Sequence, residues 1–424
     1  MTPQSPKRLA QNLAESLSLS VWDKRGIADC LCRRFPPALQ RFTQLQTQGL
    51  LDHFPTQIAP GRTAVASALA QSSVFARIHR YCVLNSVWPA PDLRAPKMQP
   101  LQAFAHLEIP QLATLGDLAD WMLLTPQQLD YYADQTGRHE EHGDMAVNHY
   151  HYHLSPKIGG GHRLIEAPKP RLKSLQRLIL RAILDHILPH PNAYGFVQGR
   201  NCIEAAARHV GEKAVVAHDL RDFFSSIQGG RIYGIFRALG YPPNVAHALT
   251  GLCTVTTPAR IRNRMGFHQR QALRVAHLPQ GAPTSPALGN LAAHGLDRRL
   301  TGLARSLGAT YTRYADDLTF SGDEHIIRAI CVAVPDIVSE EGFALNPAKT
   351  RLMPSHRRQV VTGIVVNNAT NVDRREFDQI KAAIHARAWQ TDPALQARLS
   401  GQIAWVRQLN PARGAKLERL MARA

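Results

Sequence analysis

Apolar residues recur at three- and four-residue spacing in the first 140 residues, as in LAQNLAESLSL, IADCLCRRF and LGDLADWMLL. This period places the apolar side chains on one face of a helix, so the pattern predicts amphipathic helices. Proline-bearing stretches such as FPPAL, WPAPDLRAP and EIPQ divide the region into several of them. No catalytic motif occurs there. We therefore expect residues 1–140 to form a helical N-terminal extension.

The pattern changes at about residue 148, where NHYHYHLSPKIGGGHRLIEAPKP alternates between residue types around a glycine run, Gly159 to Gly161. This arrangement predicts a strand, a glycine turn and a second strand. His149, His151 and His153 share one face of the first strand in a period of two. A metal there is conceivable, but no fourth ligand lies nearby, and the alternation favours a half-exposed strand. A helix with one apolar stripe should follow at LKSLQRLILRAILDHIL.

The remaining pattern mixes strands and helices. AVVAHDL predicts a short buried strand, YTRYADDLTF a hairpin and RQVVTGIVVNN a further strand. Helical spacing returns in the last fifty-odd residues, which carry a series of basic side chains: Arg387, Arg398, Arg407, Arg413, Lys416, Arg419 and Arg423. Because the elements do not alternate as regular βαβ units, the expected fold class is α+β.

The net charge of the chain indicates what kind of partner it binds. The chain has 50 Lys and Arg against 32 Asp and Glu, a net charge of +18. Such an excess attracts polyanions, either nucleic acid or an anionic membrane surface. No apolar run approaches the ~18 residues of a spanning helix, and the first residues lack a signal-peptide core. Nucleic acid is therefore favoured over a membrane.

Six scattered cysteines without CxxC spacing predict free thiols in a reducing cytoplasm.

Three carboxylates occupy strand ends. Asp219 closes AVVAHDL, and Asp316 with Asp317 occupies the tip of the predicted hairpin. Adjacent like charges repel, but carboxylates that converge from separate strands can hold two divalent cations about 3.5–4 Å apart for phosphoryl transfer. Either motif alone also fits an ordinary turn, because Asp is a common turn residue.

The order of motifs is more specific than any one of them. The chain reads RLIEAPKPRLKSLQR, GFVQGRN, HDLRDFFSSI, LPQGAPTSP, YTRYADD, GFALNPAKT and VTGIVVN. This series resembles the reverse transcriptases, and more closely the bacterial retron type, over roughly residues 148–370. The VTG that includes Thr362 and Gly363 is a retron-like feature.

The resemblance implies a right-hand polymerase of fingers, a palm with a small antiparallel sheet and a helical thumb. We expect fingers and palm over residues 141–370 and a basic thumb over 371–424. Asp219, Asp316 and Asp317 match the catalytic carboxylates that bind two Mg²⁺ ions. The implied substrate-binding residues are Arg163 near the triphosphate, Phe224 beneath the sugar, Gln280 and Gly281 over the nucleotide, and Lys349 near the leaving pyrophosphate. Because successive strand residues alternate faces, we expect Phe223 to point into the core and Phe224 toward the site.

Similarity to retron enzymes implies an RNA-directed DNA polymerase that uses a structured non-coding RNA as template and primer and dNTPs as substrates. The expected product is a branched RNA–DNA (msDNA), made as part of an anti-phage defence system with a separate effector protein. Two alternatives stay open. The chain could be a group II intron-like or diversity-generating reverse transcriptase, or a non-catalytic RNA-binding scaffold that would have no need of three intact carboxylates.

Overall fold

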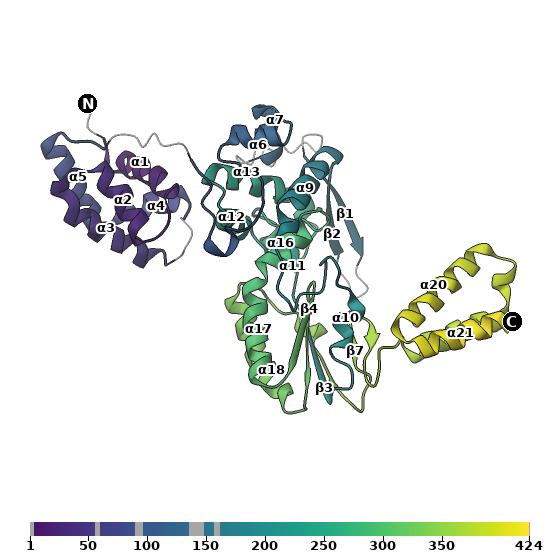
Figure 1. Cartoon of the computed structure of the whole chain (residues 1–424). Coiled ribbons are helices and arrows are strands. Elements are labelled where there is room, and N and C mark those ends of the chain that lie inside the picture. Colours follow the sequence, from purple (N-terminus) through teal and green to yellow (C-terminus); the bar gives the residue numbers. More distant parts are fainter. Residues whose placement is uncertain (1–3, 56–59, 90–95, 135–147, 157–161, 424) are drawn as a thin grey trace. The chain divides into compact units, whose positions relative to one another are not determined.

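The structure is a computed structural model that describes residues 4–55, 60–89, 96–134, 148–156 and 162–423. The chain forms two compact units, whose helices and strands are labelled in Figure 1. One combines Met1–Ile187 with Gln228–Thr284, and the other combines Leu188–Ile227 with Ser285–Ala424. Helices and small antiparallel sheets occur together, which confirms the α+β class. The predicted glycine turn at 159–161 lies outside the described residues.

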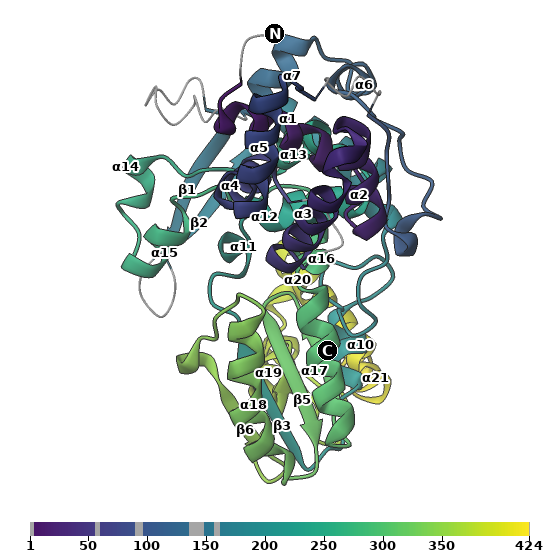
Figure 2. The same cartoon turned by 90° about the vertical axis from the view of Figure 1, so that its left-hand side faces the viewer.

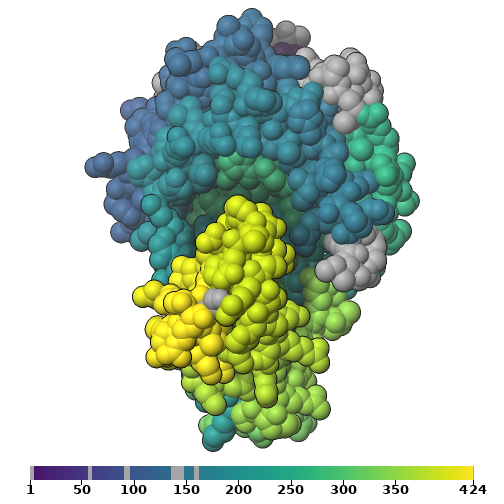
Figure 3. All heavy atoms as spheres, turned by 90° about the vertical axis from the view of Figure 1, so that its right-hand side faces the viewer, coloured from purple at the N-terminus to yellow at the C-terminus, as the bar shows by residue number. Residues whose placement is uncertain are grey.

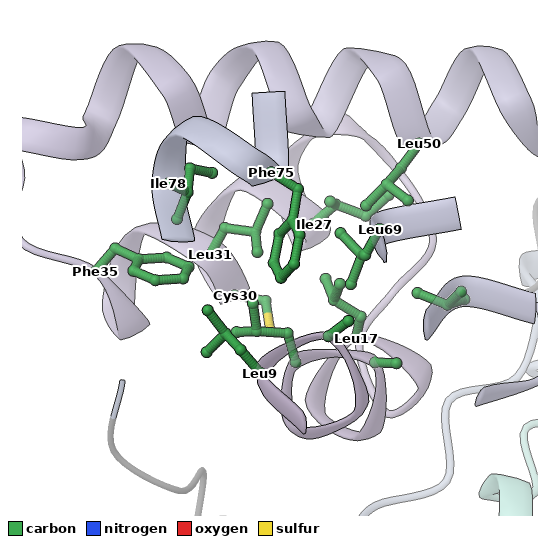
Figure 4. Close-up of a cluster of buried hydrophobic side chains, with 14 of the residues drawn as sticks. Leu9, Leu17, Ile27, Cys30, Leu31, Phe35, Leu50, Leu69, Phe75 and Ile78 are labelled. Carbon is green, nitrogen blue, oxygen red and sulfur yellow. The ribbon is translucent and has the colours of Figure 1, made fainter. Parts of the chain in front are cut away.

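The first unit begins with five helices: α1 (Pro6–Ser18), α2 (Lys24–Arg34), α3 (Gln40–His53), α4 (Arg62–Gln71) and α5 (Ser73–Asn85), with a 3₁₀ turn η1 (Pro37–Leu39). Their apolar stripes meet in a common core that includes Leu9, Ile27, Leu31 and Phe75 (Figure 4). Ser5, Asp23 and Ser72 cap α1, α2 and α5 by accepting backbone N–H bonds. Spacing and caps therefore agree with the predicted helices.

The rest of this unit contains a two-stranded antiparallel hairpin of β1 (Tyr150–Pro156) and β2 (His162–Pro168). His149 is buried against Tyr131 and Tyr132, whereas His151 and His153 are exposed. The accompanying helices are η2 (Gln102–Phe104), α6 (Leu115–Trp121), α7 (Pro126–Ala133), α9 (Pro170–Ala182), η3 (Leu184–His186), α12 (Gly229–Ala238), α13 (Pro243–Cys253), α14 (Ala259–Arg262) and α15 (Phe267–Ala272).

The second unit contains a four-stranded antiparallel sheet in the order β4-β5-β3-β6. Its strands are β3 (Ala214–Asp219), β4 (Thr310–Tyr314), β5 (Asp317–Gly322) and β6 (Arg351–Pro354). Helices α17 (His294–Ser306) and α18 (Ile326–Glu340) cover one face (Figure 1). This unit also contains α10 (Cys202–Ala207), α11 (Phe223–Ser226), α16 (Ser285–Ala292) and the 3₁₀ turn η4 (Pro347–Lys349).

The chain ends with a small hairpin, β7 (Val360–Val361) and β8 (Ile364–Val365), and then α19 (Arg374–Ala386), η5 (Ala388–Gln390), α20 (Pro393–Leu409) and α21 (Pro411–Arg423). Figure 3 shows α20 and α21 packed side by side. Buried residues of these helices, such as Ile380 and Val406, share one core with Val215 and Met353 of the sheet. Their basic side chains point outward, because all seven expected from the sequence are exposed. Within the described residues, no helix is long and apolar enough to cross a membrane.

Candidate active site

Asp219 and Asp317 are direct neighbours across the sheet. They form the last antiparallel pair between β3 and β5, so their side chains project from the same face. Asp316 precedes Asp317 in the turn from β4, and its carbonyl accepts the N–H of Leu220 at 2.8 Å. Ala315 adopts φ +57° in that turn. The structure therefore brings the three carboxylate-bearing residues to one edge of the sheet.

Lys349 reaches this edge from η4. Its Nζ donates to Oδ2 of Asp219 at 2.7 Å, with the lysine side chain 59% exposed and the aspartate 8% exposed. The backbone N–H of Asn346 donates to the carbonyl of Asp219 at 2.8 Å, which fixes the start of this segment against β3. The hydrogen bond to Asp219 raises the pKa of Lys349. The lysine is therefore a charged partner of the carboxylate cluster.

Burial and the neighbouring carboxylates both disfavour the ionised form of Asp317. Burial, followed by the charges of Asp316 and Asp219, raises the pKa of Asp317 to about 6, although Arg351 and Lys349 act in the opposite direction. A carboxylate in such surroundings is stabilised by additional positive charge. The edge therefore favours a cation.

The donor chemistry fits a divalent metal, since three carboxylates offer the hard oxygen ligands that Mg²⁺ prefers. In the part of the chain that the structure describes, however, no three His, Cys, Asp or Glu side chains are close enough to hold a metal ion as they stand. One carboxylate oxygen of Asp219 is bound to Lys349. A metal ion that bound this oxygen would take the place of Lys349.

A buried ion pair supports the turn from the other face of the sheet. Arg313 in β4 and Asp297 in α17 are both inaccessible to solvent, and two hydrogen bonds of 2.8 and 2.6 Å join them. The same guanidinium donates to Oδ1 of Asn290 at 3.0 Å and to the carbonyl of Ala315 at 3.1 Å. It thus holds the strained residue immediately before Asp316.

The loop of the GFVQGRN motif packs directly on this turn. A Cβ at Gly195 would lie 2.4 Å from the backbone nitrogen of Ala315, so only glycine fits there. Asn290 donates to the carbonyl of Gly195 at 2.9 Å. Close packing against Ala315 therefore explains why the first residue of this motif, Gly195, is a glycine.

Phe224 lies near the carboxylates in sequence, but its local structure differs from our expectation. We expected Phe223 and Phe224 to alternate along a strand, whereas Asp222 adopts φ +48° and the two residues begin helix α11. Phe223 is buried and stacks on Phe343 with ring centroids 5.8 Å apart, and Phe224 is half-buried. A Cβ at Gly289 would approach both rings to 3.1–3.3 Å. The predicted division into an inner and an outer ring therefore arises from a helical turn.

The other predicted substrate-binding residues, Arg163, Gln280 and Gly281, belong to the first unit. The RLIEAPKP and LPQG motifs contact each other there. The N–H of Glu166 in β2 donates to the carbonyl of Gln280 at 2.9 Å. Gly281 adopts φ +133°, and a Cβ there would lie 3.2–3.3 Å from the Glu166 carbonyl and the Ile165 side chain. Arg163 is exposed on the same β-strand. Arg163, Gln280 and Gly281 are therefore parts of one local structure.

This junction contains a second buried ion pair. Nε2 of His277 lies 3.1 Å from Oε2 of Glu166, and the Thr257 hydroxyl donates to Oε1 at 2.7 Å. Burial lowers the pKa of His277, but the charge and hydrogen bond of Glu166 outweigh it, so the net shift is upward. Sequence reasoning does not find this pair or the Arg313–Asp297 pair. The one available signal is a charged residue within an otherwise apolar or aromatic strand.

Comparison with known proteins decides the family. The family model described as reverse transcriptase (RNA-dependent DNA polymerase) matches residues 155–367. The chain belongs to the reverse transcriptase family. All residues singled out above for a catalytic or substrate-binding role lie within the matched range.

Within this family, the chain is similar to retron reverse transcriptases. It is 43% identical over 277 residues to the Retron Mx65 reverse transcriptase of Myxococcus xanthus, covering 64% of this chain and 64% of that protein. Identity is 37% over 289 residues with the Retron Mx162 reverse transcriptase of the same organism (63% and 59% covered). It is 34% over 226 residues with the Retron Ec86 reverse transcriptase of Escherichia coli (53% and 64%). The chain thus spans less than two thirds of the length of these relatives.

Among solved structures, the chain is similar to a telomerase from Candida albicans in complex with a TWJ fragment of telomeric RNA. The TM-score is 0.38 and the sequence identity is 10%, with 63% of this chain and 54% of that chain covered.

Proposed function

We propose that this protein is an RNA-directed DNA polymerase of the retron type. The observation that carries the proposal is the register between β3 and β5, which sets Asp219 opposite Asp317 with Asp316 beside it. Membership of the reverse transcriptase family gives this arrangement its chemical meaning. A scaffold that only bound RNA would gain nothing from three carboxylates whose charges oppose one another.

In the proposed reaction, a primer hydroxyl attacks the α-phosphorus of a dNTP, and the bond to the bridging oxygen of the pyrophosphate breaks. Asp219, Asp316 and Asp317 would hold two Mg²⁺ ions. When bound, these ions stabilise the attacking and leaving oxygens. Lys349 is the candidate donor of a proton from Nζ to the leaving pyrophosphate, once it has released Asp219.

The other proposed roles follow the family resemblance. Phe224 would lie against the sugar of the incoming nucleotide, Gln280 and Gly281 would lie over that nucleotide, and Arg163 would face its triphosphate. We assign fingers and palm to residues 141–370, with the four-stranded sheet as the palm, and the thumb to residues 371–424. Outward-facing basic side chains on α19 to α21 suit contact with a duplex backbone.

The biological substrate of this proposal is a structured non-coding RNA that serves as both template and primer. Extension from a 2′ hydroxyl of that RNA would give a branched RNA–DNA in the cytoplasm. We place this product in an anti-phage system with a separate effector protein. Similarity to three retron reverse transcriptases supports this reading over the group II intron-like and diversity-generating types.

Two assays test the proposal. The purified chain should extend a DNA primer on an RNA template with dNTPs and Mg²⁺, and chelation should stop the reaction. Nucleic acid that copurifies from the native host should contain DNA that shifts in size after treatment with a 2′–5′ debranching enzyme. Primer extension without a branched product would support another reverse transcriptase type, and absence of both would contradict polymerase function.

A further inference from the structure

An arginine-rich segment interrupts the chain between α13 and the LPQG motif. Residues 258–275, here called the arginine arm, contain five arginines and no aspartate or glutamate. The arm forms two short helices, α14 and α15, and belongs to the first unit. None of the roles proposed above involves it.

The arm is a folded element with its own attachment. Met265 and Leu273 are buried against Leu164 of β2, and α14 and α15 lie beside the β1–β2 hairpin (Figure 2). At its base, Val255 and His277 exchange two backbone hydrogen bonds of 3.0 Å. Two of the arginines are part of this framework. Arg262 donates to the Thr257 carbonyl at 3.1 Å, and Arg270 donates to two carbonyls within the arm.

The other three arginines, Arg260, Arg264 and Arg274, are exposed. Among the described residues, no ion pair involves any of them. Phe267 begins α15 with 69% of its surface exposed, and exposed His268 lies beside it with ring centroids 5.7 Å apart. Uncompensated cations around an exposed aromatic ring are what a strand of nucleic acid binds.

The arm occupies a definite face of the hairpin. Leu154 pairs with Leu164 in the register, and both pack toward the arm. Arg163 pairs with Ser155, one position along, so its side chain projects from the opposite face. The arm is therefore separated by the hairpin from the surface proposed to face the nucleotide.

We propose that the arginine arm binds single-stranded RNA, with Arg260, Arg264 and Arg274 on phosphates and a base stacked on Phe267. A single strand is favoured because its bases are free to stack on an aromatic ring, whereas those of a duplex are already paired and stacked. The choice of RNA rests on the proposed function, in which the template is RNA. The arm would then hold unpaired template on one face of the β1–β2 hairpin, while the incoming nucleotide would lie on the opposite face.

The test compares full-length variants in fluorescence anisotropy with a labelled, unstructured 20-nucleotide RNA over a range of salt concentrations. The arm variant carries Arg260→Gln, Arg264→Gln and Arg274→Gln. The matched control carries Lys24→Gln, Arg25→Gln and Arg33→Gln, three exposed cations of α2, so both lose the same charge. Without these three cations on phosphates, the slope of log affinity against log salt should be smaller by about 2. The control should retain the wild-type slope.

Phe267→Ala supplies a second readout, because it removes no charge. Affinity for the single strand should fall about five- to a hundredfold with the salt slope unchanged. Affinity for an RNA hairpin of equal length should be retained. Equal losses for the arm variant and the α2 control, or an unchanged affinity in Phe267→Ala, would overturn the proposal. An equal loss on the hairpin would also overturn it, since the arm would then not select single strands.

The same titration on an Asp317→Asn background separates the two proposals. RNA binding by the arm should persist there even though DNA synthesis is expected to stop. If wild-type protein binds RNA through the arm but never extends a primer, the polymerase proposal fails and the arm proposal stands, as an RNA-binding surface alone.

Discussion

Arg313 and Asp297 form a two-point ion pair in which neither side chain is accessible to solvent. The pair joins α17 to the strand that leads into the Asp316–Asp317 turn. Because Arg313 also donates to the carbonyl of Ala315, the pair connects the stability of this unit with the placement of the proposed metal ligands.

Asp297→Asn should therefore destabilise the protein strongly. It would leave the guanidinium buried without its counter-charge, which typically costs about 3–5 kcal/mol of the free energy of unfolding. Urea denaturation of the purified variant measures this loss. The matched control is Arg299→Gln in the partly exposed pairs with Glu340 and Glu341, where the expected loss is about 1 kcal/mol or less. Similar losses for both variants would contradict this account of the buried pair.

Phe224→Ala should change the choice of sugar. In the proposed site, the ring leaves no room for a ribose 2′ hydroxyl, which would lose its water without gaining a partner. Removing the ring should raise incorporation of ribonucleotides relative to deoxyribonucleotides by about ten- to a hundredfold. Single-nucleotide extension with matched rNTP and dNTP measures the ratio. Unaltered selectivity in a folded variant would exclude Phe224 as the steric gate.

Phe223→Ala is the companion variant, because its ring is buried against Phe343. Its main effect should be a core cavity that lowers the free energy of unfolding by about 3–5 kcal/mol. Thermal melts of the two variants should therefore differ clearly. If Phe224→Ala were the less stable of the two, the assignment of inner and outer rings would be wrong.

The exposed cations of the last helices should contribute to binding of an RNA–DNA duplex. Deleting α19 to α21 would not test this, because these helices share a core with the sheet. Replacing Arg387, Arg398 and Lys416 by Gln removes charge without touching that core. The slope of log affinity against log salt should fall by about 0.9 for each phosphate that the variant no longer neutralises. An unchanged slope would mean that these three side chains do not bind the duplex and that the helices have a structural role only.

The His277–Glu166 pair should make stability depend on pH. A raised pKa means that folded His277 holds its proton more tightly than the unfolded chain does. The stabilisation is then fully present below the unfolded value of about 6.5 and is lost as pH rises through the folded pKa. The difference in unfolding free energy between wild type and His277→Gln should thus shrink toward alkaline pH. A difference that stays constant from pH 6 to 9 would contradict a charged pair.

The sequence predicts the carboxylate edge well because strand ends and turns are local features. Asp219 ends a run of buried residues, and Asp316 and Asp317 occupy a hairpin turn, so pairing β3 with β5 is enough to bring them together. The α+β class follows in the same way from short-range periodicity. Helices near the N-terminus also carry their own caps and stripes.

Features that depend on backbone dihedrals or tertiary contacts are not accessible in this way. The positive φ of Asp222 turns the chain into α11 and removes the strand on which the alternation of Phe223 and Phe224 would depend. Burial of Arg313 depends on Asp297, sixteen residues earlier in the chain. Likewise, the meeting of Glu166 with Gln280 and His277 joins segments more than a hundred residues apart.

Primer extension by Asp317→Asn tests the central claim most directly. The substitution keeps the shape of the side chain but removes a charge that two cations would require. The matched control is Asp323→Asn. Asp323 is exposed, follows the end of β5 directly and forms an ion pair with Lys213. We predict that Asp317→Asn abolishes DNA synthesis while affinity for RNA is retained, and that Asp323→Asn behaves as wild type. Near wild-type extension by folded Asp317→Asn would contradict the assignment of this edge as the polymerase centre.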